Sequence, residues 1–216
     1  MMRRPWHERR RLSRRLFASR WADTIITEGG GGVEKMKAYR DNVRRQAAEF
    51  GRNPDDIKVL FLAQPIIDVS MEAARERVRM KEVEMDQHID LHLSGMSRLT
   101  GIDFSKFDLD APLPELTTNG HQSSLAKWIG KTPRSIVKTY GRKGGIDFSG
   151  TADHVAGMMQ EVMEEVGGDG FLLFNSYFDR RYVIEVCDGL VPELQRRGLT
   201  RKAYAHRHLR DNLLEF

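Results

Sequence analysis

Cysteine and long hydrophobic runs are the two features that this sequence of 216 residues has least of. Its single cysteine, Cys187, excludes a disulfide within the chain and is typical of a reducing compartment, so we expect a cytoplasmic protein. Apolar residues make up 40% of the chain but lie in short runs, and none approaches the roughly 18 residues of a membrane-spanning helix. We therefore expect no membrane partner, and a chain of this length can bury a substantial core.

Acidic residues are almost absent from the first twenty positions, which hold eight arginines and one acid, Glu8. The rest of the chain carries 27 basic and 30 acidic side chains, so it is close to neutral although the whole chain carries +4. The arginine-rich segment is compatible with a basic arm for nucleic acid or anionic lipid, with a transit peptide, or with a tail that has no selected role. We favour the last and expect no nucleic-acid partner, because the body adds none of the basic and aromatic patches of such a domain.

Hydrophobic spacing predicts four strands that alternate with helices. Residues 57–67 are continuously apolar at their centre, which is typical of a strand covered on both faces, and Pro65 should end its ladder. Apolar residues three or four apart from Val33 to Phe50 predict an amphipathic helix, and Thr151 stands where another helix should be capped. Since crossover helices connect parallel strands, this alternation predicts an α/β fold of four βα units. The expected strands are 22–27, 57–67, 146–149 and 170–174, and the expected helices are 33–50, 70–93, 152–166, 181–189 and 192–197.

A long insertion, at about 94–145, separates the second and third of these units. Residues 94–119 look irregular because they contain glycine, aspartate and prolines, and residues 122–140 predict one or two short helices. The insertion is therefore expected to be helical and to precede the third predicted strand.

Nucleotide-binding fingerprints are missing: no GxGxxG follows a strand, and GxxxxGK[ST] does not occur. The glycines 29–32 could approach a phosphate, although such a run is more often a plain loop. His88 and His92 would share a helical face at a spacing suited to zinc, but no third ligand is evident, so we favour a solvated face and expect no metal. Cys187 is expected to be a small core residue on the apolar side of a helix.

Polar side chains follow the predicted strands at their carboxyl ends, where α/β folds place their ligands. Gln64 ends the second strand, and Asn175, Ser176 and Arg180 follow the last one. The sequence therefore predicts that these four side chains line a substrate site, with catalytic residues left unassigned.

Several stretches resemble the C-terminal half of bacterial luciferase-like flavin monooxygenases, most of all the nitrilotriacetate monooxygenase component A branch. The resemblance runs in order over roughly 200 residues, from Phe17 to the end of the chain, and leaves residues 1–16 as an arginine-rich segment without a counterpart. It rests on 17–23 (FASRWAD), 47–58 (AAEFGRNPDDIK), 108–114 (DLDAPLP), 150–156, 168–171 (GDGF) and 191–198 (VPELQRRG).

The resemblance implies a partial (β/α)8 barrel, made of about four C-terminal βα units with a helical insertion before strand seven. It further implies reduced FMN as cofactor, a separate flavin reductase as its supplier, and a small organic substrate such as an aminopolycarboxylate or an organosulfur compound. Gln64, Asn175 and Arg180 would face that substrate.

The family segment that binds the FMN phosphate is not matched. Its positions fall on Arg10, Arg11, Ser13 and Arg14, where the small residues of the family pattern are replaced. This departure indicates a truncated or mis-started reading frame, and it raises an alternative: a non-catalytic remnant or interaction fragment that needs an N-terminal half. A half barrel would expose two strand edges and an apolar face, so we also expect self-association.

Overall fold

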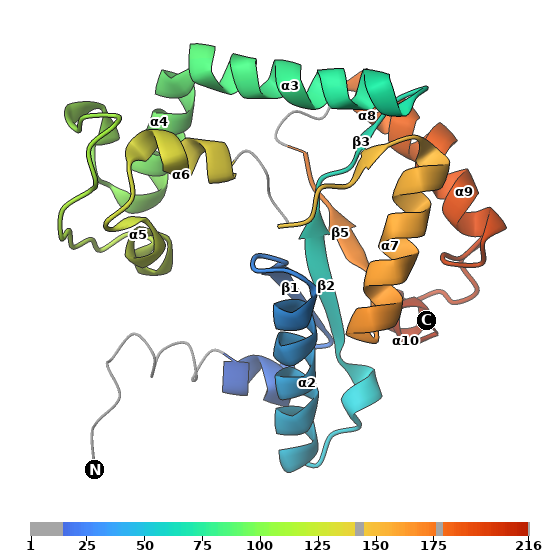
Figure 1. Cartoon of the computed structure of the whole chain (residues 1–216). Helices are drawn as coiled ribbons and strands as arrows, with labels where there is room; N and C mark the ends of the chain where they lie inside the picture. The colour runs from blue at the N-terminus through green and yellow to red at the C-terminus, as the bar shows by residue number, and fades with distance from the viewer. Residues whose placement is uncertain (1–14, 141–144, 176–178, 216) are drawn as a thin grey trace. The chain divides into compact units, whose positions relative to one another are not determined.

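The structure is a computed structural model of the whole chain and describes residues 15–140, 145–175 and 179–215. The described residues form two compact units (Figure 1). The first, here called the sheet unit, lies within Met1–Arg75 and Lys143–Phe216, and the second, the helical unit, lies within Glu76–Arg142.

Three parallel strands form the central sheet of the sheet unit, in the order β1-β2-β5. They are β1 (Thr24–Glu28), β2 (Lys58–Ala63) and β5 (Phe171–Leu173), and their register places Phe61 of β2 opposite Phe171 of β5. The strands predicted at 22–27, 57–67 and 170–174 are therefore confirmed.

The strand predicted at 146–149 is shorter and lies elsewhere than the alternation suggested. It is β4 (Ser149–Gly150), and it pairs in parallel with β3 (Ile66–Ile67), which continues the chain beyond β2. Pro65 interrupts the ladder as predicted, because proline has no N–H to donate, but pairing resumes at Ile66 with a different partner. As a result β5 pairs directly with β2, and β4 does not lie between them in the described sheet.

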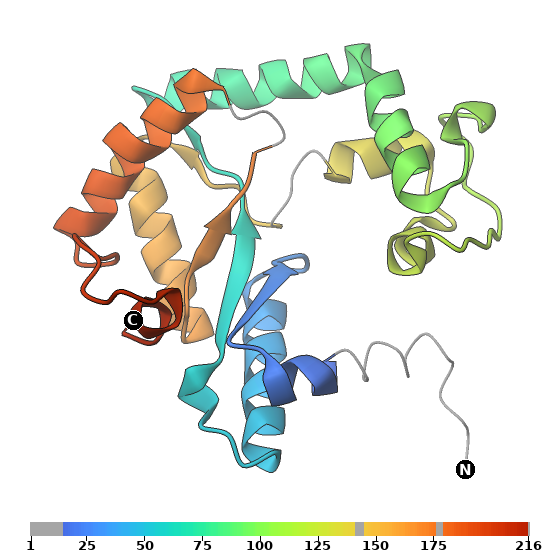
Figure 2. The same ribbon diagram turned by 180° about the vertical axis from the view of Figure 1, so that it is seen from behind.

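Two amphipathic helices cover one face of this sheet, as Figures 1 and 2 show from opposite sides. They are α2 (Val33–Glu49) and α7 (Ala152–Val166), both close to their predicted ranges. Thr151 caps α7 by accepting a hydrogen bond from the His154 N–H at 3.3 Å, and Gly167 ends it with φ 78°, a left-handed conformation that glycine adopts easily. The fully buried core between helices and sheet includes Val43, Ala47, Ile57, Val59, Phe61, Ala63, Val155, Ala156 and Val166.

Three segments after β5 form one continuous helical run: α8 (Arg180–Ile184), the π-helical turn η3 (Glu185–Leu190) and α9 (Val191–Arg196). Tyr182, Val186 and Leu190 are buried, each four residues after the last. Cys187 is exposed, so its predicted place in the core is wrong. Each residue advances about 100° around a helix, so Cys187, one position after Val186, is turned away from the buried stripe.

Asp169, the second residue before β5, connects three elements at the amino ends of the strands. Its carboxylate accepts two hydrogen bonds from Arg40 of α2, at 2.9 and 3.3 Å, and a third from the Val59 N–H of β2 at 3.0 Å. The Arg40 and Asp169 side chains are only 11% and 4% exposed. A buried carboxylate whose bonds are satisfied by a bidentate guanidinium and a backbone amide fixes its partners in one geometry.

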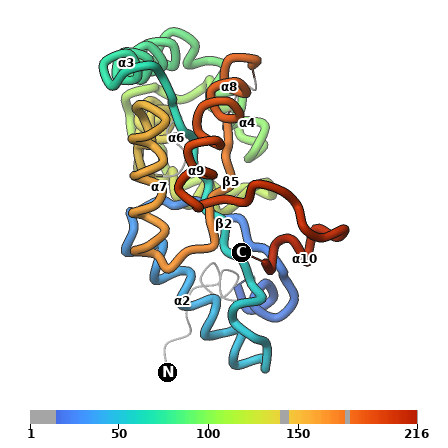
Figure 3. The backbone as a smooth tube through the Cα atoms, turned by 90° about the vertical axis from the view of Figure 1, so that its right-hand side faces the viewer, coloured from blue at the N-terminus to red at the C-terminus, as the bar shows by residue number. Residues whose placement is uncertain are grey.

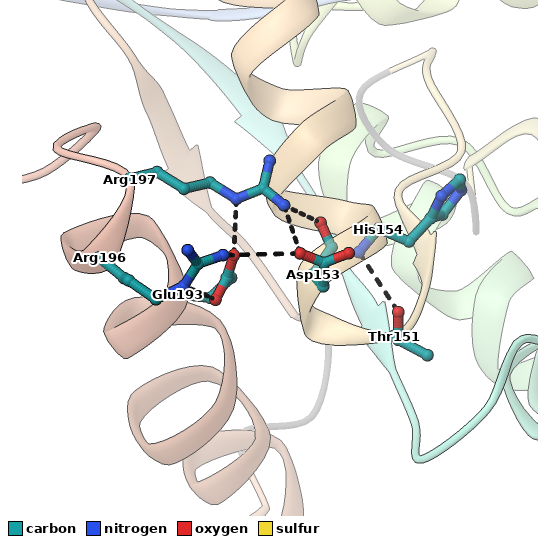
Figure 4. A network of polar contacts seen from close by, with 6 residues as sticks. All are labelled: Thr151, Asp153, His154, Glu193, Arg196 and Arg197. Atoms are coloured by element: carbon teal, nitrogen blue, oxygen red, sulfur yellow. Dashed lines mark hydrogen bonds and ion pairs between the residues drawn. The ribbon is translucent and has the colours of Figure 1, made fainter.

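An ionic network joins α9 to the beginning of α7 (Figure 4). Glu193 accepts from Arg196 and Arg197, both at 2.6 Å, and Arg197 also donates to the Asp153 carboxylate at 2.6 Å. The two guanidinium groups lower the pKa of Glu193 to about 2. Figure 3 shows α7 and α9 side by side, and this network is the polar part of their contact.

Three further segments complete the sheet unit. Residues 15–21 form a helix before β1, the 3-10 turn η1 (Pro54–Asp56) begins after Asn53, which accepts the Asp55 N–H, and α10 (Leu209–Leu214) closes the chain. Arg210 of α10 contacts Asp23 at 3.1 Å. In the described part of the chain, the helices are too short or too polar to cross a membrane.

The helical unit differs from the prediction at its start. The single helix expected at 70–93 is two helices, α3 (Met71–Gln87), which begins in the sheet unit, and α4 (Ile89–Thr100). His88 between them has non-helical backbone angles, and α4 occupies 94–100, which were expected to be irregular. The 3-10 turn η2 (Phe104–Lys106) follows. Of the one or two short helices predicted within 122–140, the structure has two, α5 (Gln122–Trp128) and α6 (Pro133–Tyr140).

A separate core holds the helical unit together. Phe104 and Trp128 meet edge to face, with ring centroids 5.7 Å apart, and both are buried. The buried residues of this core are Leu93, Met96, Phe104, Leu113, Leu125, Trp128, Ile136 and Val137.

Replacing Asp169 by Asn should lower the free energy of unfolding by about 3 kcal/mol, because the substitution leaves the buried Arg40 guanidinium without its counter-charge. Chemical denaturation at neutral pH measures the change. The matched control is Asp55→Asn, which removes another aspartate bound to an arginine of α2 but whose side chain is 72% exposed. We expect the control to leave the unfolding free energy nearly unchanged, and equal effects of the two substitutions would contradict the central place given to Asp169.

The network at Glu193 should make part of the stability depend on acid pH. The pKa of this carboxyl is about 2 in the folded chain and 4.5 in the reference state, so its contribution is present above pH 4.5 and is lost as the pH falls towards 2. Thermal unfolding from pH 6 to pH 2 should therefore show a shallower decline for Glu193→Gln than for the unchanged chain. Parallel declines would show that this network does not contribute.

Candidate functional site

Two carboxamide side chains meet at the carboxyl ends of neighbouring strands. The Gln64 Nε2 donates a hydrogen bond to the Asn175 Oδ1 at 3.2 Å, and both residues are half-buried. The Phe174 N–H donates to the Ala63 carbonyl at 2.8 Å, which extends the pairing of β2 and β5 up to this point. The backbone register thus brings together two residues that are 111 positions apart in the sequence.

Tyr182 and Asp179 hold the chain that leaves the end of β5. The Tyr182 hydroxyl donates a long hydrogen bond, 3.5 Å, to the Phe174 carbonyl, next to Asn175. The Asp179 carboxylate accepts the Tyr182 N–H at 2.7 Å and so begins α8. Burial raises the pKa of Tyr182 to about 12, so the phenol keeps its proton at neutral pH and remains a donor.

Arg181 of α8 forms ion pairs with two carboxylates. Arg181 donates to Asp68, which follows β3, at 2.9 Å, and to Glu185 at 2.6 Å. The pKa of Arg181 is raised, mainly by its hydrogen bond to Glu185. This cluster connects the end of β3 to α8, and the Arg181 guanidinium is bonded to the carboxylates of both Asp68 and Glu185.

Close backbone approaches shape the other strand ends. Gly150 ends β4 with φ 151°, and a Cβ there would lie 2.7 Å from the His154 ring and 2.8 Å from the Met71 sulfur. Gly145 has φ 73°, and a Cβ there would lie 2.8 Å from the Gly29 carbonyl oxygen, in the glycine run after β1. The loops after β1 and before β4 are therefore in contact, and only residues without side chains fit at these points.

The predicted site residues divide into three groups. Gln64 and Asn175 are together, as the strand-end argument predicted. Arg180 is exposed at the first position of α8, whereas Ser176 lies outside the described residues. Arg10, Arg11, Ser13 and Arg14, where the family's phosphate-binding segment would fall, also lie outside them.

Sequence reasoning missed two positioning residues, Tyr182 and Asp179. The available signal was an aspartate three positions before the first buried residue of a helix, which is the spacing of an N-cap.

The prediction that His88 and His92 share a helical face is wrong, because His88 precedes α4 and only His92 lies within it. In the part of the chain that the structure describes, no three His, Cys, Asp or Glu side chains are placed to hold a metal ion.

The two carboxamides at the strand ends carry hydrogen-bond donors and acceptors and no charge, and one donor and one acceptor are used in their mutual hydrogen bond. Leu62 and Leu172 lie directly opposite each other in neighbouring strands, two and three positions before the two amides. They add an apolar surface of the kind that lines ligand sites.

Comparisons with known proteins match most of this chain to one family. The family model described as luciferase-like monooxygenase matches residues 14–170. The long-chain alkane monooxygenase of Geobacillus thermodenitrificans (strain NG80-2) is 30% identical over 199 residues, which cover 92% of this chain and 42% of that protein. Nitrilotriacetate monooxygenase component A of Aminobacter aminovorans is 30% identical over 207 residues, which cover 91% of this chain and 45% of that protein.

Solved structures give the same result for the fold. A riboflavin lyase, crystallised with modified FMN and its substrate riboflavin, superposes with a TM-score of 0.76 at 26% identity, over 94% of this chain and 45% of that one. The crystal structure of a long-chain alkane monooxygenase gives a TM-score of 0.70 at 28% identity, over 92% of this chain and 42% of that one. The chain thus spans a little under half the length of the relatives it matches.

The family match covers well over half of the chain. This chain therefore belongs to the luciferase-like monooxygenase family, of whose barrel it forms about four C-terminal βα units.

Proposed function

We propose that this chain is the C-terminal part of an FMN-dependent monooxygenase that oxidises a small organic substrate and receives reduced FMN from a separate flavin reductase. The observation that carries the proposal is the Gln64–Asn175 pair, which places two carboxamides at the carboxyl ends of adjacent parallel strands. In α/β folds this is where ligands bind.

The reaction class follows from the cofactor. Reduced FMN, when bound, supplies two electrons with which O₂ delivers one oxygen atom to the substrate and the other to water. The chain's own residues bind and orient: Gln64 and Asn175 line the place where ring and substrate meet, and Arg180 stands at its exposed rim. Tyr182 acts through the backbone, because its hydroxyl holds the Phe174 carbonyl beside Asn175.

The substrate class is proposed from the relatives. One is a nitrilotriacetate monooxygenase component A, and another, from Rhodococcus erythropolis, is a dibenzothiophene-sulfone monooxygenase at 27% identity. An aminopolycarboxylate or an organosulfur compound is therefore the substrate class that we propose for the complete enzyme. The nitrilotriacetate relative is named as component A, which implies a second component, and this supports a separate reductase as a partner of the complete enzyme.

A second candidate function is a non-catalytic interaction fragment that needs an N-terminal half. This function is favoured by the fraction of the relatives' length that the chain covers, which is 42% to 47% for five relatives. The two functions differ in flavin binding, which the first requires of this chain and the second does not. We expect binding without sustained turnover from the chain alone, because the described residues supply one side of the site.

Titration of FMN with the full chain, followed by flavin fluorescence, tests the first function. We expect saturable quenching, and we expect Gln64→Ala and Asn175→Ala each to weaken binding by about five- to tenfold, the effect of one lost neutral hydrogen bond. Gln160→Ala is the matched control, because Gln160 is a glutamine of α7 that bonds Glu164 on the surface. Circular dichroism verifies that each variant is folded.

Two results would reject the monooxygenase proposal for this chain. One is the absence of any saturable change with FMN, which would leave the interaction fragment as the remaining function. The other is binding that Gln160→Ala weakens as much as Gln64→Ala does, since the flavin would then lie away from the strand ends.

A further inference from the structure

The helical run after β5 contains a π-helical turn. In η3 the chain winds more widely than in an α-helix, and the Val191 N–H donates to the Val186 carbonyl, five residues earlier. The flanking segments α8 and α9 are α-helical, and the run passes through all three without a break (Figure 3). Turns of this kind inside α-helices are rare and are frequent at functional sites, so the cause of this one bears on the site at the start of α8.

Pro192 is the residue that makes a regular α-helix unfavourable at this point. It is the second residue of α9 and lies well inside the run, not in its first turn. Proline has no N–H for the Asp188 carbonyl, four residues earlier in η3, and in an α-helix its ring would clash with that carbonyl. A wider turn relieves the clash, because its hydrogen bonds reach back five residues instead of four.

The buried residues of the run are spaced four apart, a spacing that a regular α-helix does not keep on one face. They are Tyr182, Val186 and Leu190, which are 6%, 9% and 0% exposed, and the partly buried Leu194 packs against the same core. In an α-helix, Leu194 would point about 120° away from Tyr182. A π-helical residue advances by about 80° instead of about 100°, so the six residues of η3 remove nearly all of that offset. The turn therefore keeps α8 and α9 in one rotational phase against the core.

Both ends of the run are attached to other elements of the sheet unit, but not equally firmly. Arg197, which follows α9, donates to the carboxylate and the carbonyl of Asp153 at 2.6 and 2.9 Å. In α8, the neutral Tyr182 hydroxyl donates to the Phe174 carbonyl at 3.5 Å, and the Arg181 side chain, which forms ion pairs, is 60% exposed. Short charge-assisted hydrogen bonds are stronger than a long neutral one or an exposed ion pair. If the phase were lost, α8 would therefore turn and α9 would stay in place.

We propose that Pro192 is a positioning residue of the candidate site, which acts through the π-helical turn on Tyr182. By enforcing the turn, the proline holds the Tyr182 hydroxyl against the Phe174 carbonyl, and that carbonyl is next to Asn175. Pro192 itself is exposed and ten positions further along the chain than Tyr182. Its role in a ligand site rests on the proposed function, whereas the geometry is tested without flavin, so either can fail alone.

Pro192→Ala tests the geometry, since alanine restores the N–H and favours a regular α-helix. Scalar couplings across hydrogen bonds, measured by NMR, identify the carbonyl that accepts each N–H. We expect the Val191 N–H to couple to the Val186 carbonyl in the unchanged chain and to the Cys187 carbonyl in Pro192→Ala. The matched control is Pro54→Ala, because Pro54 begins the turn η1, where a missing N–H costs little. It should leave the coupling of Val191 to Val186 in place.

The ionisation of Tyr182 measures the consequence for the site. Burial raises the pKa of its phenol to about 12, and a turn of α8 by about 100° would bring the ring into solvent. NMR of chains with ¹³C-labelled tyrosine rings should therefore show Tyr182 mostly protonated at pH 11 in the unchanged chain and in Pro54→Ala. In Pro192→Ala the pKa should fall towards the ordinary 10.0, so the phenol should be mostly ionised at that pH.

FMN affinity tests the role in the site. Pro192→Ala should weaken binding by about threefold or more, as expected when a neutral hydrogen bond that orders the site is lost. An unchanged affinity would overturn this role. If the unchanged chain does not bind FMN, the proposed function fails, and the two NMR results still decide whether Pro192 positions Tyr182.

Removal of one residue should rescue the variant. With Gly189 deleted from Pro192→Ala, a regular α-helix brings Tyr182 and Leu194 back to within about 20° of the same face. Tyr182 should then again stay protonated at pH 11, a recovery that general destabilisation would not give. The proposal is overturned if the Val191 N–H still couples to the Val186 carbonyl in Pro192→Ala, since packing would then hold the turn without the proline. Tyr182 protonated at pH 11 in Pro192→Ala, or a deletion that restores nothing, would also overturn it.

Discussion

The carboxylate of Asp169 is the contact on which the arrangement of the sheet unit depends. From a position two residues before β5, it binds the Val59 N–H of β2 and the Arg40 guanidinium of α2. One group thereby sets the register of β5 against β2 and holds the helix that covers both. Strand residues advance by about 3.3 Å each, so a slip of one residue would separate Gln64 from Asn175 and turn Leu172 to the other face. The amide pair at one end of the strands thus rests on an ion pair at the other end.

The elements that local patterns could predict are those whose hydrophobic spacing is regular. The helix from Val33 and the strand at 57–67 were predicted because burial on a helix or a strand repeats with a fixed period. The break between α3 and α4 was missed, because 10 of the 24 residues at 70–93 are charged and the apolar ones form no clear stripe whose phase could break at His88. The exposure of Cys187 was missed for a related reason: a shift of one residue around a helix decides which side is buried.

The candidate site shows the same division between local and long-range information. Gln64 and Asn175 follow from the rule that ligands bind at the carboxyl ends of parallel strands, which needs only strand ends. Their contact depends on β5 pairing directly with β2, and no local signal excludes β4 from that place. Tyr182 and Asp179, which hold the chain next to Asn175, act through backbone groups, and such roles leave little trace in composition. Membership of the luciferase-like monooxygenase family gives the pair a chemical context.

The most direct measurement of the central claim, that the amide pair forms a ligand site, is the NMR spectrum of the side-chain amides during an FMN titration. The account predicts that the Gln64 and Asn175 NH₂ resonances shift together and saturate at the same FMN concentration, because one ligand displaces or joins their shared hydrogen bond. Resonances of surface amides such as Gln160 should stay in place. Shifts confined to surface amides, or unchanged Gln64 and Asn175 resonances at saturating FMN, would contradict it.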